Sequence, residues 1–111
     1  MEIDPAPLEH RDVYQLLISL IVPRPIALVS TIAPDGIHNL APFSFFTGVC
    51  SKPPTVCLSV VRRRGGEKKD TLRNMEATRE FVVSMVSDHL AEPMNQSAAE
   101  YPPEVDEFAA A

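Results

Sequence analysis

The sequence has few cysteines and no long apolar run. Cys50 and Cys57 have no second pair and no histidine at ligand spacing, so the sequence suggests neither a zinc site nor a disulfide scaffold, and we expect two reduced core thiols. The best apolar run, Leu16–Val22, is far shorter than the ~20 residues that a membrane span needs. The first residues, Met1–Pro5, are acidic where a secretion signal would be basic and then apolar, so we expect a cytoplasmic protein.

The chain also lacks an excess of positive charge. Fifteen acidic residues face ten basic ones, and the net charge of −5 has the wrong sign for broad binding to nucleic acid or to an anionic membrane. A hydrophobic fraction of 45% and a charged fraction of 23% are those of an ordinary globular protein. The length of 111 residues leaves room for one domain, so we expect a single domain over residues 1–111.

Several catalytic motifs are missing. The sequence contains no G-x-G-x-x-G, no Walker sequence, no G-x-S-x-G and no H-E-x-x-H, so nucleotide folds, P-loop chemistry, hydrolases and zinc proteases have no support. The three histidines, His10, His38 and His89, are scattered, and we expect them on the surface. We therefore predict no catalytic side chain and no metal site.

Proline, by contrast, is abundant. The 11 prolines are about twice the usual share, and they separate the predicted elements. Apolar spacing and turn residues predict helices over Glu9–Ile21, Asp70–Met75 (with Asp70 as N-cap) and Leu90–Ala99, and strands over Ile26–Ile32, Ile37–Leu40, Thr55–Val61 and Glu80–Val86. Strands in hairpin order favour an α+β or β-barrel-like domain. The first strand is apolar on both faces, which predicts a cover on each side, from a helix or a second subunit.

An aromatic segment, Asn39–Phe46, follows the second predicted strand. It combines three phenylalanines with proline and short polar side chains, which suits a flat aromatic cofactor that needs apolar walls and a few polar groups at its edge. The alternative is that the phenylalanines are core residues and the proline marks a bend.

A basic segment precedes the second predicted helix. Residues 62–69 contain five of the ten basic residues, and a helix start with lysine and a hydroxyl can hold a phosphate without a Walker sequence. The alternative is a solvated basic loop.

These segments closely resemble the flavin reductase-like, flavoredoxin-type family of FMN-binding split barrels. The resemblance is carried by Pro23–Thr31, Asp35-Gly36, Asn39–Phe46, Lys69–Thr71 and Glu80–Val83, and extends to Met94-Asn95, Glu100–Pro102 and Glu107-Phe108. It implies a mainly β fold with helices, a Greek-key split β-barrel, and a homodimer with FMN at or near its interface. Family members continue past the equivalent of Glu107-Phe108, so we expect a barrel without its C-terminal strands.

The same resemblance implies a set of FMN contacts. It places Ser30, Thr31, Lys69, Asp70 and Thr71 around the phosphate and ribityl chain, and Asn39, Ala41, Pro42, Phe43 and Ser44 against the isoalloxazine ring, with Arg24 and Arg62 as auxiliary contacts.

The function that the resemblance implies is an NAD(P)H-dependent flavin reductase, in which NADH or NADPH passes hydride to N5 of FMN. One alternative is a flavoredoxin-like electron carrier that does not turn over pyridine nucleotide, and another is a degenerate fragment that only binds partners. A monooxygenase or another redox protein is the expected partner.

Overall fold

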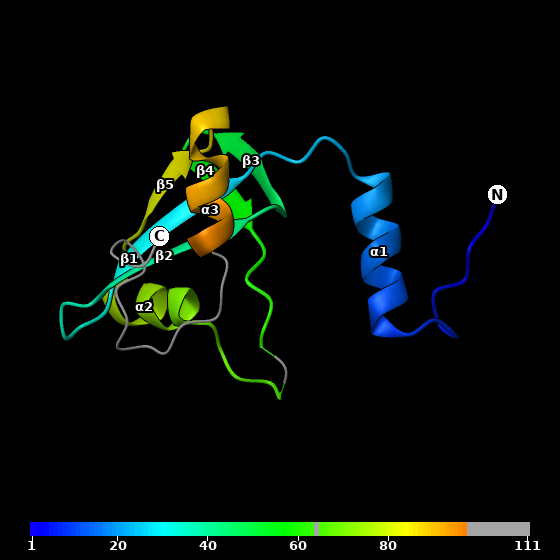
Figure 1. Ribbon diagram of the computed structural model, residues 1–111, viewed down its shortest axis with the longest axis horizontal. Coiled ribbons are helices and arrows are strands. Elements are labelled where there is room, and N and C mark those ends of the chain that lie inside the picture. Colours follow the sequence, from blue (N-terminus) through cyan, green and yellow to red (C-terminus); the bar gives the residue numbers. More distant parts are fainter. Residues whose placement is uncertain (64, 98–111) are drawn as a thin grey trace.

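A computed structural model describes residues 1–63 and 65–97 of the chain (Figure 1). Its elements are α1 (His10–Leu20), β1 (Ala27–Ile32), β2 (His38–Phe43), β3 (Phe46–Ser51), β4 (Pro54–Leu58), α2 (Asp70–Thr78), β5 (Val82–Met85), the 3-10 turn η1 (Asp88–Leu90) and α3 (Ala91–Ser97). Among these described residues, none of the helices combines the length and the apolar character required to span a bilayer.

The strands form two antiparallel sheets. One has the order β2-β1-β5, with Ala27 of β1 opposite Phe43 of β2 and Met85 of β5. The other is the hairpin β3–β4, whose register shifts between Gly48 and Cys50. Antiparallel sheets with helices in the connections confirm the expected α+β class.

The predicted turn between the first two strands is present. The Gly36 N–H donates to the Ala33 carbonyl at 2.8 Å, and Gly36 has a φ of 92°, which a residue without Cβ adopts at little cost.

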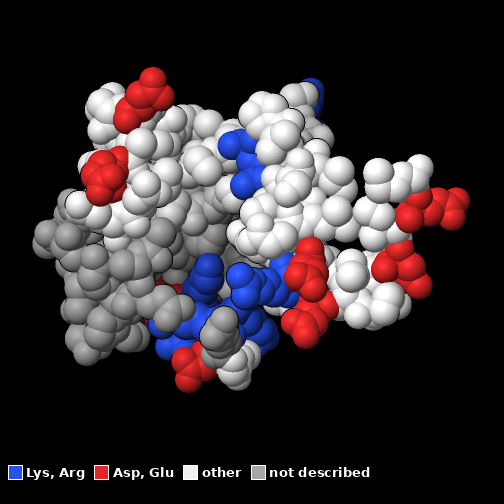
Figure 2. All heavy atoms as spheres, turned by 45° about the vertical axis from the view of Figure 1, so that its right-hand side comes forward, with Lys and Arg blue, Asp and Glu red and all other residues white. Residues whose placement is uncertain are grey.

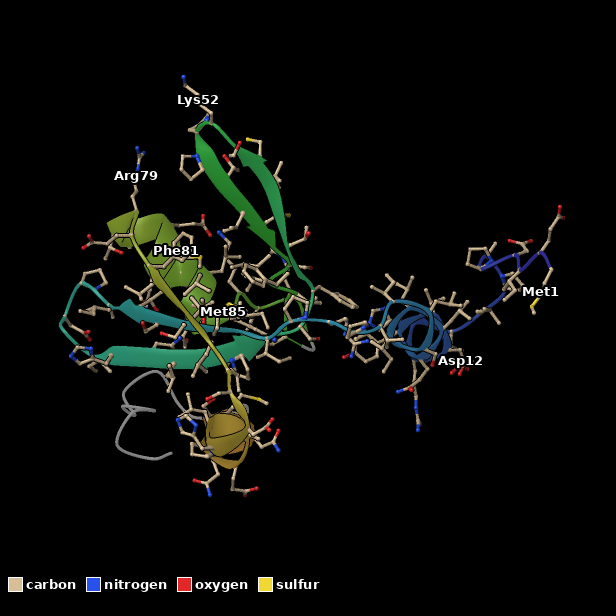
Figure 3. All side chains as sticks on the ribbon, turned by 90° about the horizontal axis from the view of Figure 1, so that it is seen from above. Met1, Asp12, Lys52, Arg79, Phe81 and Met85 are labelled. Atoms are coloured by element: carbon tan, nitrogen blue, oxygen red, sulfur yellow. The ribbon has the colours of Figure 1, made fainter. Side chains whose placement is uncertain are left out.

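The core lies on β1 and β2. Ala27, Val29 and Phe43 are buried, and Met75 of α2 and Leu58 of β4 pack against them. Leu28, which points to the opposite face of β1, is also buried, and the sheet lies between α2 and α3 (Figure 3). The prediction that β1 is covered on both faces is therefore confirmed, with helices on both sides of the sheet.

Helix α1 stands apart from the sheets (Figure 1) and has no buried residue. Its predicted position is confirmed to within a residue at each end. Its connection to β1 is held by Arg24, whose Nη1 donates to the carbonyls of Ile18 and Ile21 at 2.7 and 3.0 Å.

The predictions around the aromatic segment were wrong at two points. Strand β2 continues past Leu40 to Phe43, and β3, which was not predicted, begins at Phe46. The strand was predicted to end before Pro42 because proline cannot donate a backbone hydrogen bond. Strand β2, however, is an edge of its sheet, where the missing N–H of a proline is tolerated. The segment is thus the end of one strand and the beginning of the next.

The remaining strands and helices differ in length from their predictions. Strand β4 starts at Pro54 and stops at Leu58, α2 continues to Thr78, and β5 is confined to Val82–Met85. The last predicted helix is found as η1 and α3, up to Ser97, and its predicted final residues lie outside the described part of the chain.

Two side-chain expectations were wrong. Asp70 is not the N-cap of α2, because Lys69 occupies that position and Asp70, the first helical residue, pairs with Arg63 at 3.3 Å. Cys50 and Cys57 are exposed, not core, because they lie on the solvent-facing hairpin β3–β4. The three histidines are exposed, as expected.

Replacing Gly36 by Ala tests the turn. The φ of 92° is unfavourable for a residue with Cβ, so we expect Gly36→Ala to lower the free energy of unfolding by about 1–2 kcal/mol in urea titrations. Gly48→Ala is the control, since that glycine has open space around it and an ordinary φ. Equal stability of Gly36→Ala and the parent chain would contradict this account of the turn.

Candidate functional site

Four buried polar side chains join α2 to the sheet. The Asn39 Nδ2 donates to Thr71 Oγ1 at 2.8 Å, and the Asn74 Nδ2 donates to Thr31 Oγ1 at 2.9 Å. Thr31 and Asn39 are opposite each other in the β1–β2 register, and Thr71 and Asn74 are three residues apart on one face of α2. All four are at most 7% exposed. These bonds fix the first turn of α2 against the sheet.

Sequence reasoning assigned Thr31, Asn39 and Thr71 to the cofactor site but missed Asn74. The structure brings the three together, with their side chains bonded across the interface between helix and sheet. The signal for Asn74 was its spacing of three residues from Thr71, which places both side chains on the helix face that meets the sheet.

A second group lies where β2 ends and α2 begins. Pro42, Phe43, Ser44 and Lys69 line one hollow, together with Phe45 and Ser59. The Lys69 Nζ lies 5.4 Å from the centre of the Phe43 ring, within the range of a cation–π contact. The fold therefore joins one residue of the basic segment to the aromatic segment.

This hollow opens beside a larger groove. The hollow measures about 130 Å³, below the roughly 300–1,000 Å³ of ligand pockets, whereas the groove measures about 590 Å³. Ser44, Phe45 and Ser59 line both, and Arg24 lines the groove with its guanidinium 5.9 Å from the centre of the Phe45 ring. Arg24 Nε is buried without a hydrogen-bond partner.

Most of the basic segment is engaged within the protein. Arg63 pairs with Asp70, Lys68 pairs with Glu76 at 2.9 Å, and Arg62 donates to the Gly66 carbonyl. In Figure 2 most of the visible Lys and Arg side chains gather in one patch, and others lie apart from it. Lys69 differs from its described neighbours because its ammonium lies over an aromatic ring, at the hollow.

The other predicted residues lie elsewhere. Ser30 lines a separate hollow with His38 and Phe81, near the β5 edge of the sheet. Ala41 packs against the core. Within residues 1–63 and 65–97, no three His, Cys, Asp or Glu side chains gather as a metal site would require.

Comparison with known proteins identifies the family. The sequence pattern of the flavin reductase like domain matches residues 19–111. The chain belongs to this family. A relative from Aquifex aeolicus, an uncharacterized protein, is 52% identical over 95 residues, which are 86% of this chain and 48% of that protein.

Several solved structures have the same fold as this chain. The chain superimposes on nitrilotriacetate monooxygenase component B from Bacillus cereus with a TM-score of 0.92 and 38% identity, covering 98% of this chain and 54% of that one. For 2-nitrobenzoate 2-nitroreductase NbaA of Pseudomonas fluorescens the TM-score is 0.85 and the identity 31%, over 99% and 51% of the two chains. A protein with a split barrel domain from Shewanella frigidimarina has the same fold, with a TM-score of 0.80 and 23% identity over 99% of this chain and 55% of that one. The resemblance and the split-barrel class are therefore confirmed.

The family assignment supports a flavin-related function for this chain. The chain spans about half the length of the curated relatives that it matches.

Removing Asn74 tests the buried bonds. In Asn74→Leu the Thr31 hydroxyl loses its donor while it stays buried, so we expect the free energy of unfolding to fall by about 1–3 kcal/mol. Urea titration measures the loss, and Arg73→Ala, on the exposed face of α2, is the control.

A double variant separates the hydrogen bond from side-chain packing. Thr31→Val combined with Asn74→Leu removes both polar partners, and we expect it to recover part of the stability that Asn74→Leu loses. If the double variant loses as much free energy of unfolding as Thr31→Val and Asn74→Leu lose together, the hydrogen bond does not couple these two side chains.

Proposed function

We propose that the chain is the flavin-binding part of an NAD(P)H-dependent flavin reductase that binds FMN. The observation that carries the proposal is the placement of Lys69 beside the Phe43 ring, in a hollow that shares Ser44 and Phe45 with a groove of ligand size. Family membership and the similarity to a monooxygenase component support it.

The proposed site uses few side chains. Lys69 binds the phosphate of FMN, while Pro42, Phe43 and Ser44 contact the flavin, with Arg24 and Phe45 at the groove. When bound, FMN supplies the hydride chemistry, so the protein has to bind and orient it and no side-chain acid or base is required.

The buried bonds have an indirect role in this proposal. Thr31, Asn39, Thr71 and Asn74 hold the start of α2, and Lys69 is the residue immediately before it. Direct FMN contacts of Ser30, Thr31, Asn39, Ala41, Arg62, Asp70 and Thr71 stay predictions, as do the single domain over residues 1–111 and the cytoplasmic location.

We further propose that the protein forms a homodimer and delivers reduced flavin to a monooxygenase or another redox protein. Large apolar side chains are exposed on most elements, among them Leu20, Val49, Val82 and Met85. Where such side chains form one contiguous patch, another chain usually covers it. The Bacillus cereus neighbour is itself one component of a monooxygenase.

The Lys69→Ala variant tests the phosphate contact. Loss of a charge-assisted hydrogen bond of about 1.5–3 kcal/mol weakens FMN binding roughly ten- to hundred-fold, measured by quenching of flavin fluorescence. Lys68→Ala is the matched control, because Lys68 is held by Glu76 and is not part of the hollow.

Riboflavin distinguishes a contact of Lys69 with the phosphate from a contact with the flavin ring. It has no phosphate, so we expect it to bind the parent chain more weakly than FMN does and to bind Lys69→Ala as well as it binds the parent. Equal losses for both flavins would show that Lys69 contacts the ring and not the phosphate.

The reductase activity is tested by NADH and NADPH oxidation with free FMN as acceptor. We expect turnover with at least one nucleotide, and the visible spectrum of the purified protein reports whether flavin is bound. A yellow protein that is reduced only through a partner protein would be a flavoredoxin-like carrier, and a chain that binds no flavin would overturn the proposal.

A further inference from the structure

Helix α1 is attached to the body of the protein through Tyr14 and Arg24. The helix stands away from the sheets and has no buried residue (Figures 1 and 3). The Tyr14 ring lies 6.1 Å from the Phe45 ring, measured between their centres. Arg24 donates to the last carbonyls of the helix and places its guanidinium over the same Phe45 ring. Phe45 is therefore the point of the body on which α1 rests.

Tyr14 also lines the hollow that contains Lys69, a role that the sequence did not indicate. Tyr14 is 44% exposed, so a ligand in the hollow can reach its side chain. An isolated helix of 11 residues is marginal in water, so the contacts at Phe45 and Arg24 decide where α1 holds Tyr14. Helix α1 thus supplies one wall of a hollow whose other walls come from the ends of β2 and β4 and from the start of α2.

The hollow gathers hydrogen-bond donors from four parts of the chain. Tyr14 belongs to α1, Ser44 to the link between β2 and β3, Ser59 follows β4, and Lys69 precedes α2. Among residues 1–63 and 65–97, the three hydroxyls have no hydrogen-bond partner and the Lys69 ammonium has no carboxylate partner. No Asp or Glu is among the described residues that line the hollow. Donors that face no carboxylate suit the oxygens of a phosphate.

We propose that Tyr14 is a specificity-determining residue of the flavin site, whose phenol hydroxyl donates to the phosphate that Lys69 binds. The inference rests on the proposed FMN site and adds α1 to it. The hollow is smaller than a ligand pocket, so it suits the terminal group of a ligand whose larger part lies in the adjoining groove. A hydrogen bond to a charged phosphate contributes more than one between neutral groups, so Tyr14 favours FMN over riboflavin.

The same contact links flavin binding to the stability of α1. Without a ligand, the helix has no buried residue, and its amides exchange by local opening. A phosphate held between Tyr14 and Lys69 joins α1 to the start of α2. Because such a ligand binds the formed helix and not the opened one, it stabilises α1.

The Tyr14→Phe variant tests the hydroxyl, because it keeps a ring beside Phe45 and removes only the donor. We expect it to weaken FMN binding about tenfold, measured by quenching of flavin fluorescence, and to leave riboflavin binding within about twofold of the parent value. Ser19→Ala is the control. It removes a hydroxyl from the same helix that bonds to the Gln15 carbonyl and is not part of the hollow, so we expect unchanged FMN affinity.

Hydrogen exchange gives a second readout at saturating flavin. We expect FMN to slow exchange of the α1 amides in the parent chain, and to slow it less in Tyr14→Phe. Riboflavin, which lacks the phosphate, is expected to leave exchange of α1 close to that of the flavin-free protein. Exchange of α1 that FMN does not change would overturn the inference.

The outcomes separate this inference from the proposed function. A parent chain that binds no flavin overturns the proposed function and this inference with it. FMN binding that is weakened by Lys69→Ala but not by Tyr14→Phe overturns the inference alone. Equal losses of FMN and riboflavin in Tyr14→Phe also overturn it, because they place the hydroxyl against the flavin and not against the phosphate.

Discussion

The position of the candidate site depends on two buried hydrogen bonds between side chains. Asn39 to Thr71 and Asn74 to Thr31 connect neighbouring positions of β1 and β2 to one face of α2. A buried polar group without a partner costs about 1–3 kcal/mol, so a shifted helix would leave several groups unsatisfied at once. Apolar packing alone tolerates small slides of a helix on a sheet. The directional hydrogen bonds do not tolerate such slides, and they therefore fix where α2 begins.

The start of α2 in turn decides where Lys69 lies. As the residue before the first helical turn, Lys69 has extended backbone and is aimed along the end of β2, where it meets Phe43. Phe43 is buried and forms part of the core, so its ring is a fixed surface. The cation and the aromatic ring belong to segments 26 residues apart in sequence, and the polar bonds and the core bring them together.

Local sequence signals predicted the elements better than their ends or their contacts. The Pro34-Asp35-Gly36 turn and the helix before Pro23 were predictable because proline and glycine restrict the backbone directly. Strand β3 was missed because the exposed hairpin does not alternate apolar and polar residues. Asp70 was taken for a cap because neither the start of α2 one residue later than the cap position nor the pairing of Asp70 with Arg63 in the preceding loop has a local sequence signal. The role of Asn74 likewise depends on Thr31, 43 residues away.

The basic segment shows why charge counted along a sequence overstates an anion site. Arg63 and Lys68 are paired with carboxylates of α2, and Arg62 is bonded to a carbonyl of its own loop. These bonds shape the loop and lower its net attraction for a phosphate, and the exposed Lys68 pair is further weakened by salt. The Lys69 ammonium, by contrast, lies over the face of the Phe43 ring and has no carboxylate partner among residues 1–63 and 65–97, and a cation–π contact is a weaker attraction than a carboxylate pair. In the proposed site, a phosphate would therefore engage Lys69 without breaking any of the described ion pairs, and this difference from its neighbours follows from the fold and not from the sequence.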